Sequence, residues 1–296
     1  MILGKLVSRS QAESALCGVP FSTDFPPHVM PKSPAELLSE VKHALEHQMD
    51  AFGSLVYTDV PIQKNSPESE DTETPANLFG ESTHSKQITE DSSPYTRIEN
   101  LIPTESPLNR LSTLEEVARF VASTMLTPLD ETRTNPVFGV GNPNADLLVI
   151  GEAPGADEDK QGEPFVGRAG QLLTKILQAI GFERNDVYIA NILKSRPPNN
   201  RDPLREEIEA HIPILYKQIA LIRPKLILCV GKTAGTSLLN LNTSLAKMRG
   251  VFHDYHGLPV LVTYHPAALL RNPNWKRPTW EDVQLLRAHY DELGGA

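Results

Sequence analysis

Cysteine is scarce in this sequence, with only two among 296 residues. Two thiols exclude a disulfide framework, and they also exclude any metal cluster that takes four thiolates from one chain. Long hydrophobic runs are absent as well, since the longest apolar stretches are no longer than a β-strand, so we expect no transmembrane segment and no membrane partner. The apolar stretch at the start of the chain is too short for a signal peptide, so we expect a cytoplasmic protein.

Positive charge is in deficit, with 28 Lys and Arg against 37 Asp and Glu for a net charge of −9. Such a balance taken alone argues against nucleic-acid binding. The deficit is uneven, because residues 1–110 carry 8 basic and 16 acidic residues while residues 111–296 carry 20 and 21. Cations in the second part cluster around residues 194–205 and 271–277, and such clusters bind phosphates whatever the total charge.

The first 110 residues are predicted to lie outside the main domain. Residues 61–110 are rich in Ser, Thr, Pro, Asn and Glu and poor in apolar residues, which predicts a disordered acidic linker. Residues 1–60 form an N-terminal extension, in which a capping box at 33–36 predicts the start of an amphipathic helix over about 34–53. This helix either packs on its own domain or docks a partner protein from a flexible tether.

Residues 111–296 alternate short apolar runs with stretches of helical periodicity. The expected strands are 145–150, 187–192, 226–230 and 260–263, and the helices between and after them include 170–180, 206–222 and 280–293. Alternation of this kind predicts an α/β fold, a three-layer α/β/α sandwich with a central, mainly parallel sheet.

Each expected strand runs directly into a polar segment. These segments are residues 151–159, 191–201, 231–233 and 264–271. Open parallel sheets bind ligands in the crevice beyond the carboxyl ends of their strands. The sequence therefore predicts one site at which carboxylates, an amide, a histidine and arginines meet.

The motifs in these segments resemble the uracil-DNA glycosylase superfamily, most closely its family-4 (type-4) bacterial and archaeal enzymes. The resemblance covers roughly residues 115–290 and includes GEAPG (151–155), RPPNNR (196–201) and HPAALLR (265–271). It implies a uracil-DNA glycosylase-like fold. It also implies a monofunctional DNA-repair glycosylase that flips uracil out of DNA and hydrolyses the uracil–deoxyribose bond, leaving an abasic site in base-excision repair.

The resemblance assigns two catalytic residues. Cleavage builds positive charge on the sugar and negative charge on the departing base, so a carboxylate and a hydrogen-bond donor each stabilise one half of the transition state. Glu152 takes the carboxylate role and orients the water, while His265 donates to a uracil oxygen. The alternatives are that Glu152 caps the following helix and that His265 is an ordinary, hydrogen-bonded histidine.

The uracil pocket is assigned in the same way. Asn191 reads the amide edge of the base, because its side chain both donates and accepts, and Phe165 stacks on the ring. Gly151 and Ala153 let the backbone approach the base, and Glu158 crowds its 5-position and excludes thymine. The alternatives are a turn closed by Asn191 and an ordinary core position for Phe165.

The expected DNA contacts come from two motifs. Leu269 and Leu270 form an apolar wedge that enters the duplex, and Arg271 binds a phosphate beside them. Lys194 and Arg201 add cations from the second motif. The alternative for the wedge is a plain amphipathic helix start.

One departure from the family pattern concerns a cofactor. Family-4 enzymes typically hold an iron–sulfur cluster through four cysteines, and by the resemblance those positions are here Thr124, Thr127, Ser195 and His211. None of them is a thiol. We therefore predict no iron–sulfur cluster, no other metal and no cofactor, and we expect a polar network at that corner.

Two other functions compete with uracil release. The same fold could act on another deaminated base, hypoxanthine or xanthine, or the protein could be a catalytically silent DNA-binding repair protein. The intact Glu152, Asn191 and His265 favour the enzyme. On the leading interpretation the substrate is uracil-containing DNA, and a partner of the N-terminal helix would be a repair or replication protein.

Overall fold

The computed structural model describes residues 93–295, so the predicted extension 1–60, with its helix over about 34–53, and most of the predicted linker lie outside the described residues. The described part contains one sheet in the order β1-β3-β2-β4-β6-β5. Its strands are β1 Val140–Gly141, β2 Leu147–Gly151, β3 Tyr188–Asn191, β4 Leu226–Val230, β5 Phe252–Tyr255 and β6 Leu258–Thr263. The four central strands are parallel and are the four that the sequence predicts.

Both edge strands run antiparallel to their neighbours and were not predicted. β1 has only two residues, which is too short for a recognisable alternation of polar and apolar residues. β5 joins β6 through His256 and Gly257, which both have positive φ, at 55° and 96°. A two-residue loop with this geometry matches the right-handed twist of a β-hairpin.

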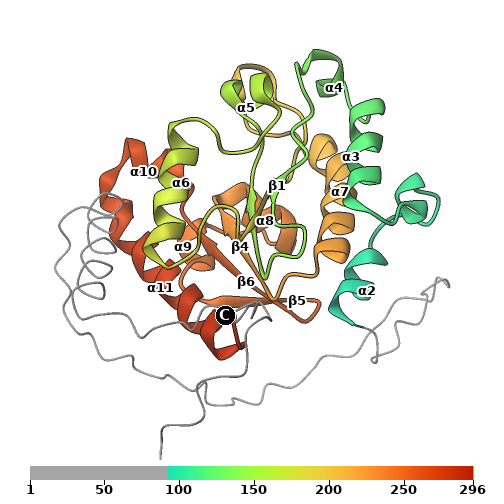
Figure 1. Ribbon diagram of the computed structural model, residues 1–296. Helices are drawn as coiled ribbons and strands as arrows, with labels where there is room; N and C mark the ends of the chain where they lie inside the picture. Colours follow the sequence, from blue (N-terminus) through green and yellow to red (C-terminus); the bar gives the residue numbers. More distant parts are fainter. Residues whose placement is uncertain (1–92, 296) are drawn as a thin grey trace, which may run out of the picture. The chain divides into compact units, whose positions relative to one another are not determined.

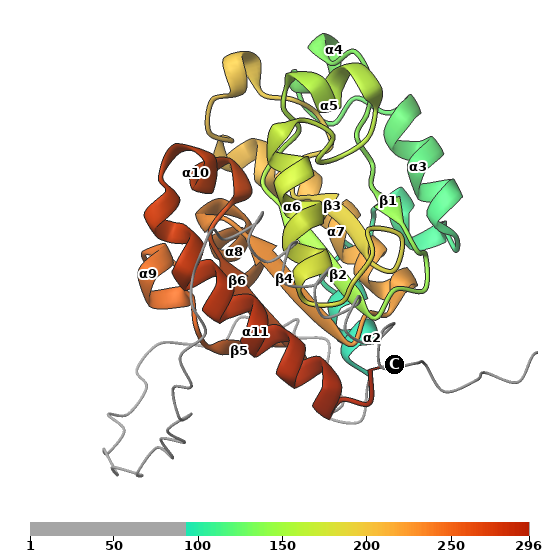
Figure 2. The same cartoon turned by 60° about the vertical axis from the view of Figure 1, so that its left-hand side comes forward.

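Helices cover both faces of the sheet, which confirms the predicted three-layer α/β/α architecture (Figures 1 and 2). Along β2, Leu147 and Val149 join one hydrophobic cluster while Leu148 and Ile150 join the other. The first cluster includes side chains of α6 Arg168–Ala179, α10 Pro266–Arg271 and α11 Lys276–Glu292. The second includes side chains of α2 Pro94–Glu99, α7 Arg205–Ile222, α8 Lys232–Leu239 and α9 Leu245–Met248.

Shorter helices complete the described chain. They are α3 Leu114–Ser123, α4 Leu129–Thr132, α5 Ala156–Gln161 and the 3-10 turns Pro107–Arg110, Pro198–Asn200 and Pro273–Trp275. Every helix among residues 93–295 is too short or too polar to cross a bilayer.

The predicted linker extends too far toward the domain. Residues 93–110 pack onto it, with Ile98, Ile102 and Leu108 buried and Glu99 paired with Lys217 of α7. Ile98 and Ile102 are four residues apart, but the pattern is too short, in a polar stretch, to predict packing from the sequence. The packed domain therefore includes residues 93–110, which the prediction placed in the linker.

Candidate active site

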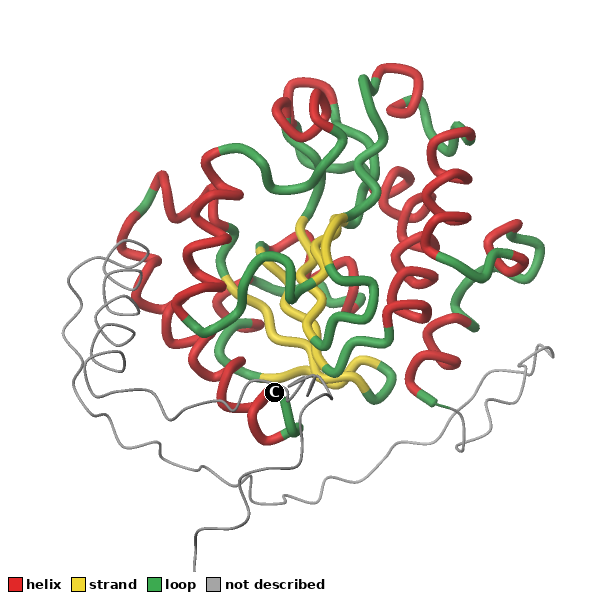
Figure 3. Tube along the Cα trace, viewed as in Figure 1, coloured by secondary structure: helices red, strands yellow, loops and turns green. Residues whose placement is uncertain are grey.

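The polar segments that follow the parallel strands meet at one end of the sheet, where loops lie beyond the strands (Figure 3). Gly151 ends β2 and Asn191 ends β3, and the two residues are partners in the parallel register. The amides of the next two residues, 192 and 193, donate to the carbonyls of Gly151 and Glu152 at 2.9 and 3.0 Å. His265 lies two residues beyond the end of β6 and is the N-cap of α10.

Gly151 allows an unusually close approach of three chain segments. A Cβ atom at this position would lie 2.3 Å from Asn191 Oδ1 and 2.7 Å from the ring of Phe165. Any larger residue would displace one of these two side chains. The absence of a side chain at 151 therefore brings together the amide and the aromatic ring that the resemblance assigns to the uracil pocket.

Phe165 is held in a strained position beside His265. It is buried, its φ of 54° is in the left-handed region, and its ring stacks on the imidazole with centroids 5.5 Å apart. Non-glycine residues adopt this backbone region at a cost, and such positions concentrate at functional sites. Phe165 belongs to the site as well as to the edge of one hydrophobic cluster.

Glu158 connects the two loops that frame this ring. Its Oε1 accepts the N–H groups of Val166 and Gly167 at 3.0 and 3.2 Å, and its Oε2 accepts the N–H of Gly155 at 3.1 Å. The carboxylate thus fixes the backbone directly after Phe165. This contact was not evident from the sequence, and the predicted contact of Glu158 with the uracil 5-position stays a prediction.

Glu152 and Ala153 follow β2 directly, and both are partly buried. Burial raises the pKa of the Glu152 carboxyl, a hydrogen bond with Thr233 opposes the shift, and the negative charge of Asp202 adds to it. The N-cap of the following helix α5 is Gly155, so Glu152 does not cap that helix.

His265 is organised as a neutral hydrogen-bond donor. Burial lowers its pKa to about 4, the charge of Arg271 lowers it further, and Glu158 opposes the shift. Its Nδ1 accepts the N–H of Ala267 at 3.1 Å. A neutral imidazole that accepts at Nδ1 carries its proton on Nε2, so Nε2–H is the donor available to a substrate oxygen.

We expect nitrogen-15 NMR of the free protein to show His265 as the neutral Nε2–H tautomer from pH 5 to 8. The reason is that both the burial and the Ala267 amide favour this form over the doubly protonated one. The partly exposed His256 provides an internal comparison in the same spectra. A titration of His265 with a midpoint above pH 6 would contradict the assignment.

Asn191 presents an unused acceptor. Its residue is 2% exposed and its Oδ1 is buried without a hydrogen-bond partner. Buried polar atoms are nearly always paired, so an orphaned one points to a ligand that completes it. An N–H group of a bound base is such a partner, and the turn suggested as an alternative role for Asn191 is not what its side chain forms.

The predicted wedge is divided between core and surface. Leu270 is 42% exposed and Arg271 is also exposed, whereas Leu269 is fully buried in a hydrophobic cluster. Adjacent positions on a helix face different directions, so the two leucines cannot both project outward. The structure contradicts a DNA contact by Leu269 and leaves Leu270 and Arg271 available for one.

A DNA contact by Lys194 is also contradicted. The residue is fully buried, and its Nζ donates to Asn191 O and to Gln218 Oε1 at 2.7 and 2.6 Å. Burial lowers the pKa of Lys194 to about 7. Arg201 is partly exposed but is paired with Glu207 at 2.6 Å, so its contact with phosphate stays a prediction.

Two aromatic residues near the site were missed. Trp275 is exposed, and its ring stacks on Tyr264 with centroids 5.1 Å apart and an interplanar angle of 10°. Tyr264 directly precedes His265. The only signal in the sequence was their position on either side of the HPAALLR motif, which does not specify a contact.

The corner to which the resemblance assigns a cluster contains a polar network centred on Asp130. Its Oδ1 accepts from Ser195 Oγ and from Arg133 at 2.8 Å, and its Oδ2 accepts the amides of Leu126 and Thr127 at 2.7 and 2.9 Å. Burial opposes ionisation of Asp130, but these hydrogen bonds outweigh it and hold its pKa below the usual range. The ionised Asp130 thereby neutralises the positive charge of Arg133 inside the fold.

His211 completes this network. Its Nδ1 accepts the amide of Lys194 at 3.1 Å, and its Nε2 lies 3.5 Å from Thr127 Oγ1. Thr124 contributes only its carbonyl, to Arg133. The residues at the four positions therefore offer no thiolate and no free imidazole nitrogen, and they do not fit an iron–sulfur cluster.

The described residues offer no other metal centre. Among residues 93–295, no three His, Cys, Asp or Glu side chains are grouped closely enough to hold a metal ion. Cys229 is buried in β4, and burial raises the pKa of its thiol well above the usual range.

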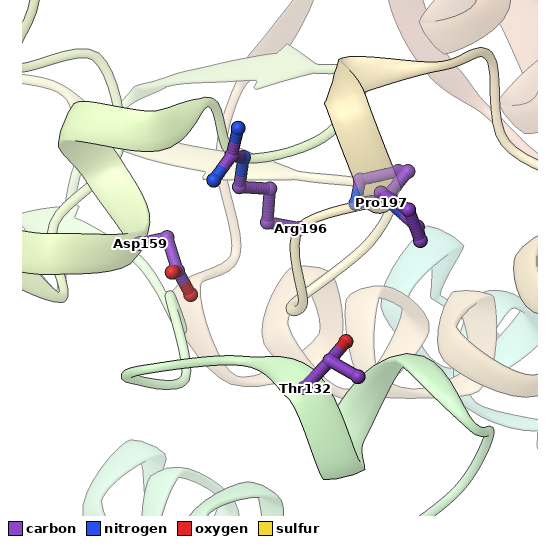
Figure 4. A pocket seen from close by; sticks show the side chains of 5 residues that line it. Thr132, Asp159, Arg196 and Pro197 are labelled. Atoms are coloured by element: carbon purple, nitrogen blue, oxygen red, sulfur yellow. The ribbon is translucent and has the colours of Figure 1, made fainter.

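A small pocket of about 180 Å³ lies between α4, α5 and the loop after β3. Thr132, Asp159, Arg196, Pro197 and Pro198 line it (Figure 4). None of the residues assigned to catalysis or to uracil is among them. We therefore place the candidate active site at the strand ends and not in this pocket.

Comparison with known proteins identifies the family of this chain. The family model described as the uracil DNA glycosylase superfamily matches residues 138–284. A type-4 uracil-DNA glycosylase of Archaeoglobus fulgidus is 44% identical over 184 residues, covering 60% of this chain and 92% of that protein. One of Sulfurisphaera tokodaii is 42% identical, covering 60% and 84%, and one of Pyrobaculum aerophilum is 41% identical, covering 58% and 92%. The chain therefore belongs to the type-4 uracil-DNA glycosylase family of the uracil-DNA glycosylase superfamily.

Proposed function

We propose that the protein is a monofunctional uracil-DNA glycosylase of base-excision repair, a hydrolase that removes uracil from DNA and leaves an abasic site. The observation that carries the proposal is the orphaned Oδ1 of Asn191, buried between Gly151 and Phe165. A flipped uracil offers an N–H to this acceptor and a carbonyl oxygen to the amide's donor. Phe165 supplies the ring face against which the base stacks.

Glu152 and His265 stabilise the two opposite charges that develop during cleavage. As the glycosidic bond breaks, positive charge grows on the deoxyribose and negative charge on the uracil. The Glu152 carboxylate stabilises the sugar cation and orients the attacking water. The neutral imidazole of His265 donates its Nε2–H to the uracil oxygen. This hydrogen bond stabilises the departing anion, and the imidazole keeps the same protonation state throughout.

The proposal is tested by incubating the protein with matched oligonucleotides that carry uracil, hypoxanthine, xanthine or thymine at one position. Alkaline cleavage then reports abasic sites. We expect strand breaks at uracil and none at thymine. Release of hypoxanthine or xanthine in preference to uracil would instead support a glycosylase for another deaminated base. If no oligonucleotide were cleaved, the result would support a DNA-binding protein without catalytic activity.

We also propose that the enzyme works without an iron–sulfur cluster, since the Asp130 network occupies the corner that a cluster would fill. Protein purified anaerobically is expected to lack visible iron–sulfur absorbance and stoichiometric iron. A cluster-bearing type-4 enzyme prepared in parallel controls for loss during purification. One cluster's iron per chain would contradict the proposal.

The location and partners follow from the substrate. We propose that the enzyme acts in the cytoplasm, where it has access to DNA, and that the predicted helix at 34–53 binds a repair or replication protein. A pull-down with the full chain and with a variant lacking residues 34–53 tests the second point. Equal recovery of such a protein by both would contradict it.

A further inference from the structure

The β1 and β3 strands separate just before the candidate site. Their antiparallel register pairs Val140 with Ile189 and residue 141 with residue 188. Two residues further along the same register, Phe138 would lie opposite Asn191. β1 begins only at Val140, so this pair is not made. The chain turns away from β3 at Gly139. Its φ of 153° is readily adopted by glycine but rarely by other residues, and a Cβ at this position would lie 2.7 Å from the ring of Tyr188.

Two buried side chains bridge the gap where that pair is missing. Lys194 Nζ donates to the Asn191 carbonyl at 2.7 Å and to Gln218 Oε1 at 2.6 Å. Gln218 Nε2 in turn donates to the Phe138 carbonyl at 3.0 Å. Lys194 and Gln218 thus connect, through their side chains, the two backbone carbonyls that strand pairing would have brought together.

This bridge satisfies two carbonyls with side chains whose burial is unfavourable. Lys194 and Gln218 are both fully buried, and among the described residues no carboxylate forms an ion pair with the ammonium. Taking an amine out of water without a counter-ion destabilises its charged form, and burial accordingly lowers the pKa of Lys194 to about 7. Continued pairing of β1 with β3 would satisfy the same backbone at less cost, so the bridge points to a requirement for separated strands at this place.

We infer that the Lys194–Gln218 bridge is a positioning device that holds the Asn191 backbone so that its side chain faces the flipped base. The inference rests on the proposed function, because it assigns a role within that site. Neither side chain touches the substrate. Asn191 Oδ1 has no protein partner, so its direction depends on the backbone from which it projects, and the Asn191 carbonyl is fixed by the ammonium.

The test compares three buried substitutions under single-turnover conditions with uracil-containing DNA. Lys194→Met removes both bonds of the ammonium, whereas Gln218→Met removes the links to Phe138 and to Lys194 but leaves the bond from Lys194 to the Asn191 carbonyl. Lys217→Met is the matched control, since Lys217 is also a buried lysine but pairs with Glu99. We expect the cleavage rate to fall about 10- to 100-fold for Lys194→Met, because a displacement of a substrate-positioning group by about 1 Å lowers the rate by up to about 100-fold. We expect a smaller fall for Gln218→Met and none for Lys217→Met, with the affinity for DNA unchanged in all three.

A double-mutant cycle separates positioning from general stability. If Lys194 acts through Asn191, adding Lys194→Met to Asn191→Ala will not lower the cleavage rate further, while the losses in melting temperature will still add. Multiplying rate losses would overturn the inference, as would a weaker DNA affinity with an unchanged rate. If Lys194→Met does not fold, Gln218→Met in the same cycle decides. Failure of the wild-type protein to release uracil would instead remove the proposed function.

Discussion

Replacement of Glu152 by Gln is expected to lower the rate of uracil release by about 10²- to 10⁴-fold, the range for a positioned acid–base group. The change keeps the shape of the side chain but removes the charge that stabilises the sugar cation and orients the water. The half-buried site strengthens this effect, because the charge is poorly screened there. Single-turnover cleavage of a uracil-containing oligonucleotide measures it.

The pH dependence of the wild-type rate provides a second readout of Glu152. Burial raises the pKa of this carboxyl, and the role that we propose for it requires the ionised form. The rate should therefore fall as the pH drops through a value above the usual range of a glutamate, and this acid limb should be lost in Glu152→Gln. Glu105→Gln, at an exposed carboxylate away from the strand ends, should leave both rate and profile unchanged. A Glu152→Gln rate within threefold of wild type would contradict the role.

Replacement of Asn191 by Ala is expected to lower the rate by about 10²- to 10³-fold, which is the usual cost of removing one donor to a developing anion. Alanine removes both the donor and the orphaned acceptor that we assign to the base. Asn191→Asp should be at least as damaging, because a carboxylate of the same shape repels the departing uracil anion. Single-turnover rates with uracil-containing DNA measure both changes.

The control for these variants is Asn185→Ala, an exposed asparagine in the loop before β3. It should retain the wild-type rate and melting temperature. If Asn191→Ala released uracil as fast as this control, the base would be recognised by other groups and the assignment of Asn191 would be wrong.

The sequence allowed the central fold to be predicted because its information is local. The four parallel strands are short apolar runs, and each ends in a polar motif, so their positions could be read one at a time. The edge strands and the packing of residues 93–110 depend on contacts between distant segments. Ile98, for example, is buried among side chains of the second cluster, and nothing in its neighbourhood along the chain indicates this.

The candidate site shows the same limit at the level of single side chains. Glu152, Asn191 and His265 were predicted together because each follows a strand of the same sheet. Lys194 and Leu269 were assigned to DNA because they lie in the same motifs, but the direction of a side chain is set by the tertiary fold. Lys194 turns back onto the carbonyl three residues before it, which its position in the motif does not reveal.

We infer that the amide of Asn191 and the carboxylate of Glu152 enable this protein to release uracil from DNA. The most direct measurement is cleavage of oligonucleotides that differ only in carrying uracil or thymine, by wild-type protein and by the Asn191→Ala and Glu152→Gln variants. We predict abasic sites at uracil alone with the wild type and a loss of at least about 10²-fold with each variant. Equal uracil release by all three proteins, or none by the wild type, would contradict the account.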